Sequence, residues 1–189
     1  MLIGNFSVVN RDPLGKGRRF SLGQGEYGVS DESDLALTTV LGSCVAACIH
    51  DPVAGVGGMN HFVLARRNRG ATGDPARYGD HLMPLLIEGL LQAGAKLNRL
   101  EAQVFGGASP GNFVNSIGQD NLAFACGFLE ELGVPVGVGE QSGPAGCRIV
   151  FWPASGHVTH KPLTRVKETQ LRRIILPLVR PLNLTPAAA

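Results

Sequence analysis

Short apolar runs separated by turn residues recur along the chain, a pattern typical of strands. The run Leu35–Leu41 is rich in Leu, Thr and Val. A second run, 45–50, ends at the turn residues Asp51-Pro52-Val53-Ala54-Gly55, and a third run, 56–65, follows that turn. The pattern therefore predicts one strand at 35–41, followed by a hairpin whose two strands lie at 45–50 and 56–65.

Apolar residues at helical spacing predict helices farther along the chain. In the segment 80–93 the leucines recur on one helix face, and Asp80 can cap the start. The segment 116–132 begins with Ser116 and Gln119, which fit a capping box. Further strands are expected at 102–105, 134–138, 148–152 and 157–161, and a final helix at about 164–175.

The order of these elements predicts an α/β (α+β) fold. Regular alternation of strands and helices is missing, so we expect a layered sandwich with a mixed, largely antiparallel sheet and helices packed outside. The length of 189 residues suits one domain, which we place at 21–176. Residues 1–20 are predicted to be a partly ordered N-terminal arm, and the proline-containing segment 177–189 a flexible tail.

Composition narrows the class of protein. With 44% hydrophobic and 17% charged residues the chain is globular rather than disordered. A formal net charge of +2 is too small to favour nucleic acid as a partner. No signal peptide is visible, and no stretch approaches the roughly 20 apolar residues of a membrane span. The four scattered cysteines indicate free thiols in a reducing cytoplasm, and no cofactor is expected.

Candidate chemistry lies at Gly42-Ser43-Cys44 and at His61. If residues 51–54 form a four-residue hairpin loop, His50 faces Gly55, and counting back places Cys44 directly opposite His61. Opposed residues share a face of the sheet, with Cβ atoms about 4.5–5.5 Å apart. A slip of one residue would send the two side chains to opposite faces. The loop length therefore predicts a thiol–imidazole pair.

Such a pair has a chemical purpose, because only the thiolate of a cysteine is a good nucleophile. A free thiol has a pKa near roughly 8.5, and a neighbouring imidazole can take its proton. Small residues before the nucleophile, Gly42 and Ser43, leave backbone N–H groups open to a developing oxyanion. Either Thr38 or Thr39 on the preceding strand can orient the imidazole, as the third member of a triad does.

Other interpretations use the same residues. A lone cysteine is most often a core residue, and a lone histidine is often a satisfied interior one. Cys44, Cys48, His50 and His61 fall on one face and offer metal ligands, but Cys-x3-Cys-x-His is not a usual zinc spacing, so no metal is expected. The glycine-rich stretches 55–58 and 106–111 lack the lysine of a phosphate-binding loop and are interpreted as turns.

Ordered motifs carry a resemblance to a known family. The sequence resembles the CheD family, the chemoreceptor glutamine deamidases of bacterial and archaeal chemotaxis, from Leu22 to about Pro162. The matching segments are Leu22-Gly23-Gln24-Gly25-Glu26-Tyr27, Thr38-Thr39-Val40-Leu41-Gly42-Ser43-Cys44-Val45, Asp51-Pro52, Gly57-Gly58-Met59-Asn60-His61, Arg77-Tyr78-Gly79-Asp80, Phe105-Gly106-Gly107-Ala108, Ile117-Gly118 with Asn121, and Ser155-Gly156-His157-Val158.

The resemblance implies a cytoplasmic, thiol-dependent amidohydrolase that converts receptor glutamines to glutamates through a Cys thioester. It maps the family's catalytic residues on Cys44, His61 and Thr38, and chooses Thr38 over Thr39. The implied fold is a layered α/β sandwich. The implied partners are the cytoplasmic signalling domains of chemoreceptors and, in some lineages, a CheC-type phosphatase.

Three points remain open from the sequence. Phe105, with Gly106 and Gly107, is a candidate docking edge for the substrate, although Phe105 fits a core position equally well. A non-catalytic adaptor that binds receptors or a CheC-type phosphatase is the alternative function, which the intact Cys44 and His61 argue against. A thiol peptidase or transglutaminase would share the acyl-enzyme, so sequence does not separate these activities from deamidation.

Overall fold

The computed structural model describes residues 1–5, 8–11, 17–70, 72–108, 117–139 and 146–163, which form two β-sheets and two α-helices. Sheet A has the strand order β1-β4-β7-β6-β8-β9. Its strands are β1 (Leu2–Asn5), β4 (Glu26–Ser30), β7 (Val56–His61), β6 (Val45–Asp51), β8 (Glu101–Gly106) and β9 (Val136–Val138). All its neighbours are antiparallel except β8 and β9.

Sheet B has the strand order β11-β10-β5-β3-β2. Its strands are β11 (His157–Pro162), β10 (Cys147–Trp152), β5 (Leu35–Leu41), β3 (Arg18–Ser21) and β2 (Val8–Arg11). Only β3 and β5 run parallel. The helices are α1 (Gly79–Gln92) and α2 (Ile117–Glu131), with short 3-10 turns η1 (Pro75–Arg77) and η2 (Leu97–Arg99).

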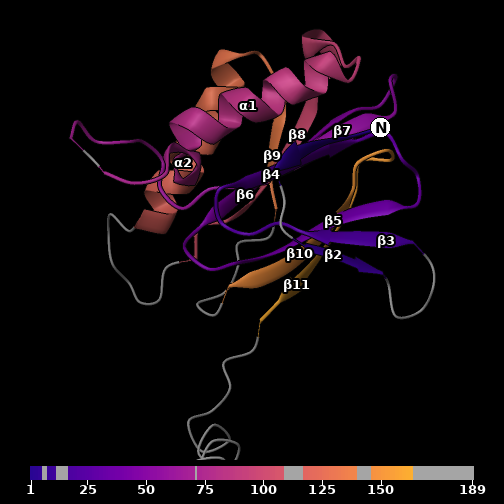
Figure 1. Ribbon diagram of the computed structural model, residues 1–189. Coiled ribbons are helices and arrows are strands. Elements are labelled where there is room, and N and C mark those ends of the chain that lie inside the picture. Colours follow the sequence, from indigo (N-terminus) through magenta and orange to yellow (C-terminus); the bar gives the residue numbers. More distant parts are fainter. Residues whose placement is uncertain (6–7, 12–16, 71, 109–116, 140–145, 164–189) are drawn as a thin grey trace, which may run out of the picture.

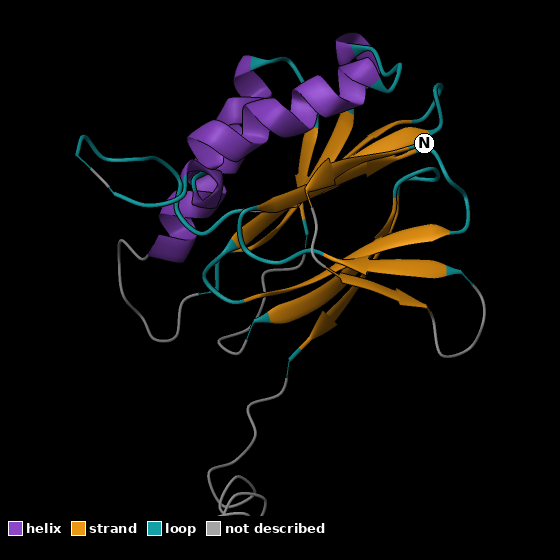
Figure 2. Cartoon of the chain, viewed as in Figure 1, coloured by secondary structure: helices purple, strands orange, loops and turns teal. Residues whose placement is uncertain are grey.

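The molecule has three layers: the two helices, sheet A and sheet B (Figures 1 and 2). Both helices cover one face of sheet A, and the apolar face of α1 supplies the buried Leu82, Leu86 and Leu90 to that core. Sheet B packs on the opposite face of sheet A, where Leu37, Met59 and Phe151 are fully or almost fully buried. Sheet A is therefore covered on both faces, which explains why almost every residue of β6 and β7 is buried.

The expected fold class is confirmed, with differences in detail. The strand Leu35–Leu41 has the predicted bounds, and the helix expected at 80–93 is α1. The strands form two sheets rather than one, and the described helices pack on sheet A only. The helix expected at 164–175, the tail 177–189 and the capping residue Ser116 lie outside the described residues.

In the segment 1–20, expected to be a partly ordered arm, described residues form short strands: β1 pairs with β4 and β3 pairs with β5. These strands have four residues each, so no alternation long enough to reveal them is present in the sequence. Their pairing partners lie far along the chain and supply the hydrogen bonds that hold them.

The hairpin of β6 and β7 has the predicted loop length but begins one residue later. Asp51 pairs with Val56, so the loop is 52–55 and each facing pair differs by two positions from the expected register. The cause is the Asp51 carboxylate, which is fully buried, accepts N–H bonds from Val53 and Ala54, and is held by Arg99 at 2.6 Å. Asp51 therefore ends the strand and does not begin the loop.

Candidate functional site

Cys44 lies where the chain passes from one sheet to the other. Strand β5 ends at Leu41 in sheet B and β6 begins at Val45 in sheet A, so Gly42, Ser43 and Cys44 form the crossing. Cys44 is only 8% exposed, whereas Gly42 and Ser43 are exposed. The crossing thus holds the thiol at the inner edge of the layer between the sheets, with open backbone beside it.

The loop after β8 fixes this crossing through main-chain hydrogen bonds. The amide of Gly107 donates to the Cys44 carbonyl at 3.0 Å, and the amide of Ala108 donates to the Gly42 carbonyl at 2.8 Å. Gly106 has a φ of +108°, and a Cβ there would lie 2.1 Å from the Cys44 carbonyl oxygen. Only glycine fits at this position, so Gly106 and Gly107 support the Cys44 backbone.

Asn121, in the first turns of α2, connects the crossing to the segment that follows β7. Its side-chain amide donates to the Ser43 carbonyl at 3.1 Å and to the Val63 carbonyl at 2.8 Å, and the residue is 1% exposed. The start of α2 sits close to the loop after β8, since a Cβ on Gly118 would lie 2.5 Å from the Gly107 carbonyl oxygen. Helix α2 therefore braces both sides of the Cys44 backbone.

His61 is the last residue of β7, and its ring lies in the layer between the sheets. It is 4% exposed, and its Nδ1 lies 2.9 Å from the Thr39 hydroxyl of sheet B. The same hydroxyl donates to the Leu22 carbonyl at 2.7 Å. A hydroxyl has one proton, so it must accept from His61, and we assign the ring proton to Nδ1.

That assignment leaves the other ring nitrogen, Nε2, with a free lone pair. Nε2 is buried and has no hydrogen-bond partner among the residues that the structure describes. A buried polar atom without a partner is costly in a native protein and needs an explanation. A general base, which accepts a proton only during a reaction, would explain such an atom.

Cys44 and His61 are diagonal neighbours on one face of sheet A. Val45 pairs with Phe62 in an isolated bridge, so Cys44 and His61 both face away from the helices. Diagonal positions are about 7–8 Å apart at Cα, within reach of an imidazole. The directly opposed pair expected from the hairpin count is therefore wrong by two residues, although the shared face is as predicted.

The surroundings of the pair favour a neutral thiol and a neutral imidazole at rest. Burial raises the pKa of Cys44, while its own backbone N–H and the positive charge of Arg77 act in the opposite direction. Burial lowers the pKa of His61, while the Leu22 carbonyl and the charge of Glu26 act against that change. A neutral imidazole can accept a proton, and a neutral thiol can donate one.

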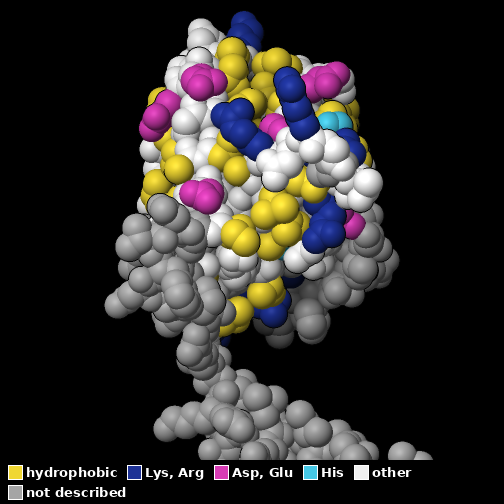
Figure 3. All heavy atoms as spheres, turned by 90° about the vertical axis from the view of Figure 1, so that its left-hand side faces the viewer, with side chains coloured by type: hydrophobic (Ala, Val, Ile, Leu, Met, Phe, Trp, Pro, Cys, Tyr) yellow, Lys and Arg dark blue, Asp and Glu magenta, His cyan; other side chains and the backbone are white. Residues whose placement is uncertain are grey.

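Arg77 belongs to an exposed basic segment beside the site. The segment between β7 and α1 also carries Arg66, Arg67 and Arg69, all exposed. Figure 3 views the molecule from the side on which this segment projects and shows several Lys and Arg side chains on that face, among acidic and apolar ones. A positive charge near a thiol stabilises the thiolate form.

Two of the predicted site residues lie elsewhere than expected. The Thr38 hydroxyl donates to the Ile149 carbonyl at 2.8 Å within sheet B, and the hydroxyl on His61 is that of Thr39. Phe105 is 4% exposed and stacks on His160 at 5.9 Å between ring centroids, so it is a core residue and offers no exposed docking edge. The core interpretation of Phe105 is the one that the structure supports.

Sequence reasoning left one neighbour of the site undecided and missed two. Thr39 is one of two choices that the sequence leaves open, since adjacent threonines leave the orientation of the strand undecided. Asn121 occurs in a matching segment of the resemblance, but nothing in the local pattern connects it to Ser43. Gln24, whose side-chain Nε2 lies 3.9 Å from the Cys44 sulfur, comes from a loop between two strands of different sheets.

The residues of the metal alternative are not gathered in one place. Within the described ranges no group of three His, Cys, Asp or Glu residues could hold a metal ion. Cys48 is buried in the core between the sheets, and His50 donates from Nδ1 to the Pro153 carbonyl at 2.8 Å.

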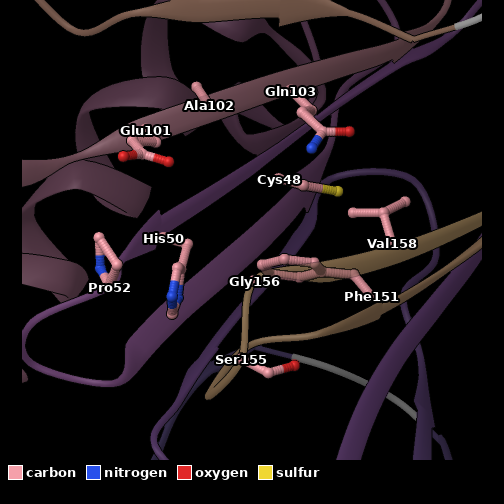
Figure 4. A pocket seen from close by; sticks show the side chains of 10 residues that line it. All are labelled: Cys48, His50, Pro52, Glu101, Ala102, Gln103, Phe151, Ser155, Gly156 and Val158. Atoms are coloured by element: carbon pink, nitrogen blue, oxygen red, sulfur yellow. The ribbon is translucent and has the colours of Figure 1, made fainter.

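A pocket of about 260 Å³ opens between the sheets at the other end of β6 (Figure 4). Glu101 and Gln103 of β8 lie on one side of it, and Phe151 and Val158 of sheet B on the other. Cys44 and His61 are not among its lining residues. The pocket is therefore separate from the site at the crossing.

Fold and geometry together define a cysteine–histidine site between two β-sheets, and comparisons with known proteins identify the family. The family model described as CheD chemotactic sensory transduction matches residues 63–162. This chain belongs to the CheD family, which confirms the resemblance stated from the sequence motifs.

Its relatives have closely similar sequences. A protein of Agrobacterium fabrum named probable chemoreceptor glutamine deamidase CheD is 50% identical over 153 residues, covering 81% of this chain and 84% of that protein. A protein of the same name from Rhizobium leguminosarum bv. trifolii is 49% identical over 158 residues, covering 82% and 85%. No helix in the described part of the chain is long and apolar enough to cross a membrane.

Proposed function

We propose that this chain is a chemoreceptor glutamine deamidase, an amidohydrolase that converts glutamine side chains of its protein substrate to glutamates. The family membership and the names of the relatives support this activity. The observation that carries the chemistry is the bare, buried Nε2 of His61 on the same face of sheet A as the Cys44 thiol. The reaction consumes water and releases ammonia.

The first half of the reaction forms a thioester. His61 Nε2 takes the proton from Cys44 Sγ, and the thiolate attacks the glutamine Cδ, so a C–S bond forms and the carbonyl becomes an oxyanion. The imidazolium then returns its proton to the departing nitrogen, which leaves as ammonia when the C–N bond breaks. Water, deprotonated by His61, then attacks the thioester carbon. The C–S bond breaks, glutamate is released, and the imidazolium returns its proton to the Cys44 thiolate.

Backbone groups beside the thiol are suited to the oxyanion. Neither the Ser43 nor the Cys44 amide donates a hydrogen bond to a backbone carbonyl of any described residue, and Ser43 and Gly42 are exposed. The carbonyls of Gly42 and Cys44 are held by the loop after β8, so the peptide planes at the crossing are fixed before substrate arrives. Hydrogen-bond donors that are already in position stabilise an oxyanion most effectively.

Thr39 is proposed as a positioning residue in place of Thr38. Its hydroxyl lies between the Leu22 carbonyl and His61 Nδ1, so it fixes both the ring orientation and the tautomer. The tautomer matters because a proton on Nε2 would remove the base from the reaction.

The substrates proposed are the cytoplasmic signalling domains of chemoreceptors, which places the enzyme in the cytoplasm. A CheC-type phosphatase is proposed as a second partner on the strength of the family resemblance. Deamidation adds a negative charge to a receptor helix and changes the balance of repulsion between neighbouring helices.

The test is a deamidation assay with matched cysteine variants. A receptor signalling domain is incubated with the enzyme, released ammonia is measured, and Gln-to-Glu changes are mapped by mass spectrometry. Wild type and Cys48→Ala should release ammonia, because Cys48 is a core residue of β6, whereas Cys44→Ala should release none above background. Activity that survives Cys44→Ala, or a wild type that binds the receptor without releasing ammonia, would overturn the proposal, the second result in favour of an adaptor. Backbone cleavage would identify a peptidase.

A further inference from the structure

We propose that Gln24 is a catalytic residue of this deamidase, whose side-chain amide donates a hydrogen bond to the oxyanion formed during attack by Cys44. This assignment rests on the proposed function. Its basis is the juxtaposition of Gln24 Nε2 and the Cys44 sulfur, 3.9 Å apart, at the exposed edge of the layer between the sheets.

The loop that carries Gln24 is tied to both sheets. The Leu22 amide donates to the Thr38 carbonyl of sheet B at 2.8 Å, and the Gly25 amide donates to the His61 carbonyl of sheet A at 2.8 Å. Within the loop the Gly23 amide donates to the Glu26 carboxylate at 2.7 Å. The position of Gln24 is therefore set by the same backbone that sets Thr39 and His61.

A glycine next to Gln24 allows the loop to approach the segment that contains Arg77. Gly25 has a φ of +82°, and a Cβ there would lie 3.3 Å from the Ala76 backbone, in the turn η1. The loop thus rests on η1, next to Arg77. Gln24 is exposed, so its amide is open to a substrate side chain that approaches Cys44.

The Gln24 amide donates its hydrogen bond to a weak acceptor. Among the residues described, the only hydrogen-bond acceptor recorded for Nε2 is the Cys44 sulfur, and a thiol sulfur is a weak acceptor. In the tetrahedral intermediate the oxyanion and the sulfur are bonded to the same carbon. An N–H group at this distance from the sulfur needs only a small shift to reach the roughly 2.7–3.1 Å from the oxyanion that stabilisation requires.

The chemistry of the amide suits this role. It is neutral, so it places no charge beside Cys44 or His61 before attack. It offers two N–H donors, and a donor that exchanges a weak sulfur acceptor for an oxyanion gains most in the transition state. Gln24 and the backbone amides at the crossing would then share the developing charge.

The test separates this role from a merely structural one. Gln24→Met keeps the length of the side chain and removes both donors, and Gln92→Met, at an exposed glutamine in the last turn of α1, is the matched control. We expect kcat for deamidation of a receptor signalling domain to fall by about 10²–10³-fold in Gln24→Met, with KM nearly unchanged. The rate at which iodoacetamide alkylates Cys44 should stay within about twofold of wild type, because alkylation forms no oxyanion.

Two results of these measurements would overturn the role of Gln24. A kcat within about threefold of wild type would overturn the role of Gln24, and so would a parallel loss of kcat and alkylation rate, which indicates a displaced nucleophile. Wild type measured in the same assay distinguishes the two proposals. If wild type releases no ammonia, the proposed function itself fails, whereas an active wild type with an equally active Gln24→Met variant refutes only the role of Gln24.

Discussion

Two cysteine–histidine pairs lie along β6, β7 and the crossing that precedes β6. Cys44 and His61 lie at the crossing between the sheets, and Cys48 and His50 lie toward the hairpin loop. All four residues were expected on one face, and either pair could have been chosen from residue type alone. The difference between them is in their surroundings.

Cys48 is in the middle of a central strand. Burial, followed by the neighbouring Cys147, raises its pKa far above the ordinary value of a thiol. His50 has its Nδ1 committed to the Pro153 carbonyl. This pair is part of the packing between the sheets and the wall of a pocket.

Cys44 has the same chemistry in a different position. It is next to exposed backbone, Arg77 opposes the effect of burial on its pKa, and His61 keeps a bare nitrogen. The passage of the chain between two sheets, rather than the Cys–His spacing, therefore distinguishes the proposed reactive pair from the packed one.

Substituting the two histidines should give the largest contrast. We expect His61→Gln to lower kcat/KM for deamidation by about 10²–10⁴-fold, since the proton acceptor is lost. The kcat/KM of His50→Gln should stay within about threefold of wild type, because His50 bonds to Pro153 near the hairpin loop, away from Cys44. The measurement is steady-state ammonia release. Equal losses in both variants would remove the distinction between the two ends.

Asp51→Asn should destabilise the hairpin end without affecting chemistry. Burial alone would raise the pKa of Asp51, but hydrogen bonds from Arg99 and from the amides of Ala54, Lys96 and Val53 outweigh it and hold that pKa well below the usual range. Losing the charge should lower the free energy of unfolding at neutral pH by about 2–3 kcal/mol in urea titrations.

The pH dependence of this effect has a defined sign. Because the folded pKa is lowered, the stabilisation is present above about pH 4 and is lost as the pH falls toward the folded pKa. The difference between wild type and Asp51→Asn should therefore shrink in acid, whereas Glu130→Gln at an exposed helix position should change little at any pH. A difference that does not vary with pH would contradict the buried ion pair.

Thr39→Val and Thr38→Val distinguish the two threonines. We expect Thr39→Val to lower kcat by about tenfold, or ~1.4 kcal/mol, since the imidazole loses the partner of its Nδ1 proton. Thr38→Val should change kcat less, because Thr38 bonds to Ile149 within sheet B. Ammonia release over a range of pH is the readout, and a larger loss in Thr38→Val would restore the residue that the resemblance selected.

Arg77→Gln should give the smallest effect. Removing the charge that lowers the pKa of Cys44 should raise that pKa and slow alkylation by iodoacetamide two- to threefold at mildly alkaline pH, in keeping with ~0.5 kcal/mol for an exposed charge. Added salt should narrow the gap to wild type. An alkylation rate that does not respond to Arg77→Gln or to salt would show that Arg77 has no influence on the thiol.

The local pattern of residues was enough to predict helices and strands and to predict that Cys44 and His61 share a face of the sheet. Strand Leu35–Leu41 follows from its richness in Leu, Thr and Val, helix α1 from the helical spacing of its leucines, and the family from the motifs. The register of the hairpin could not be predicted from the local pattern, because it depends on the binding of Asp51 by Arg99, which lies far along the chain.

The local pattern of residues also could not predict which of Thr38 and Thr39 contacts His61. It depends on which side of β5 faces sheet A, and that is decided by the packing of Leu35, Leu37 and Leu41 in the core between the sheets. The role of Gly106 required the loop after β8 to meet the crossing, a contact between segments that no spacing reveals.

Labelling of the native protein with limiting iodoacetamide tests the central claim most directly, with carbamidomethylation of each cysteine and residual deamidase activity measured on the same samples. We predict that activity falls in proportion to modification of Cys44 while Cys48 and Cys147, buried between the sheets, stay unmodified. Full deamidase activity in protein that is completely modified at Cys44 would contradict the account.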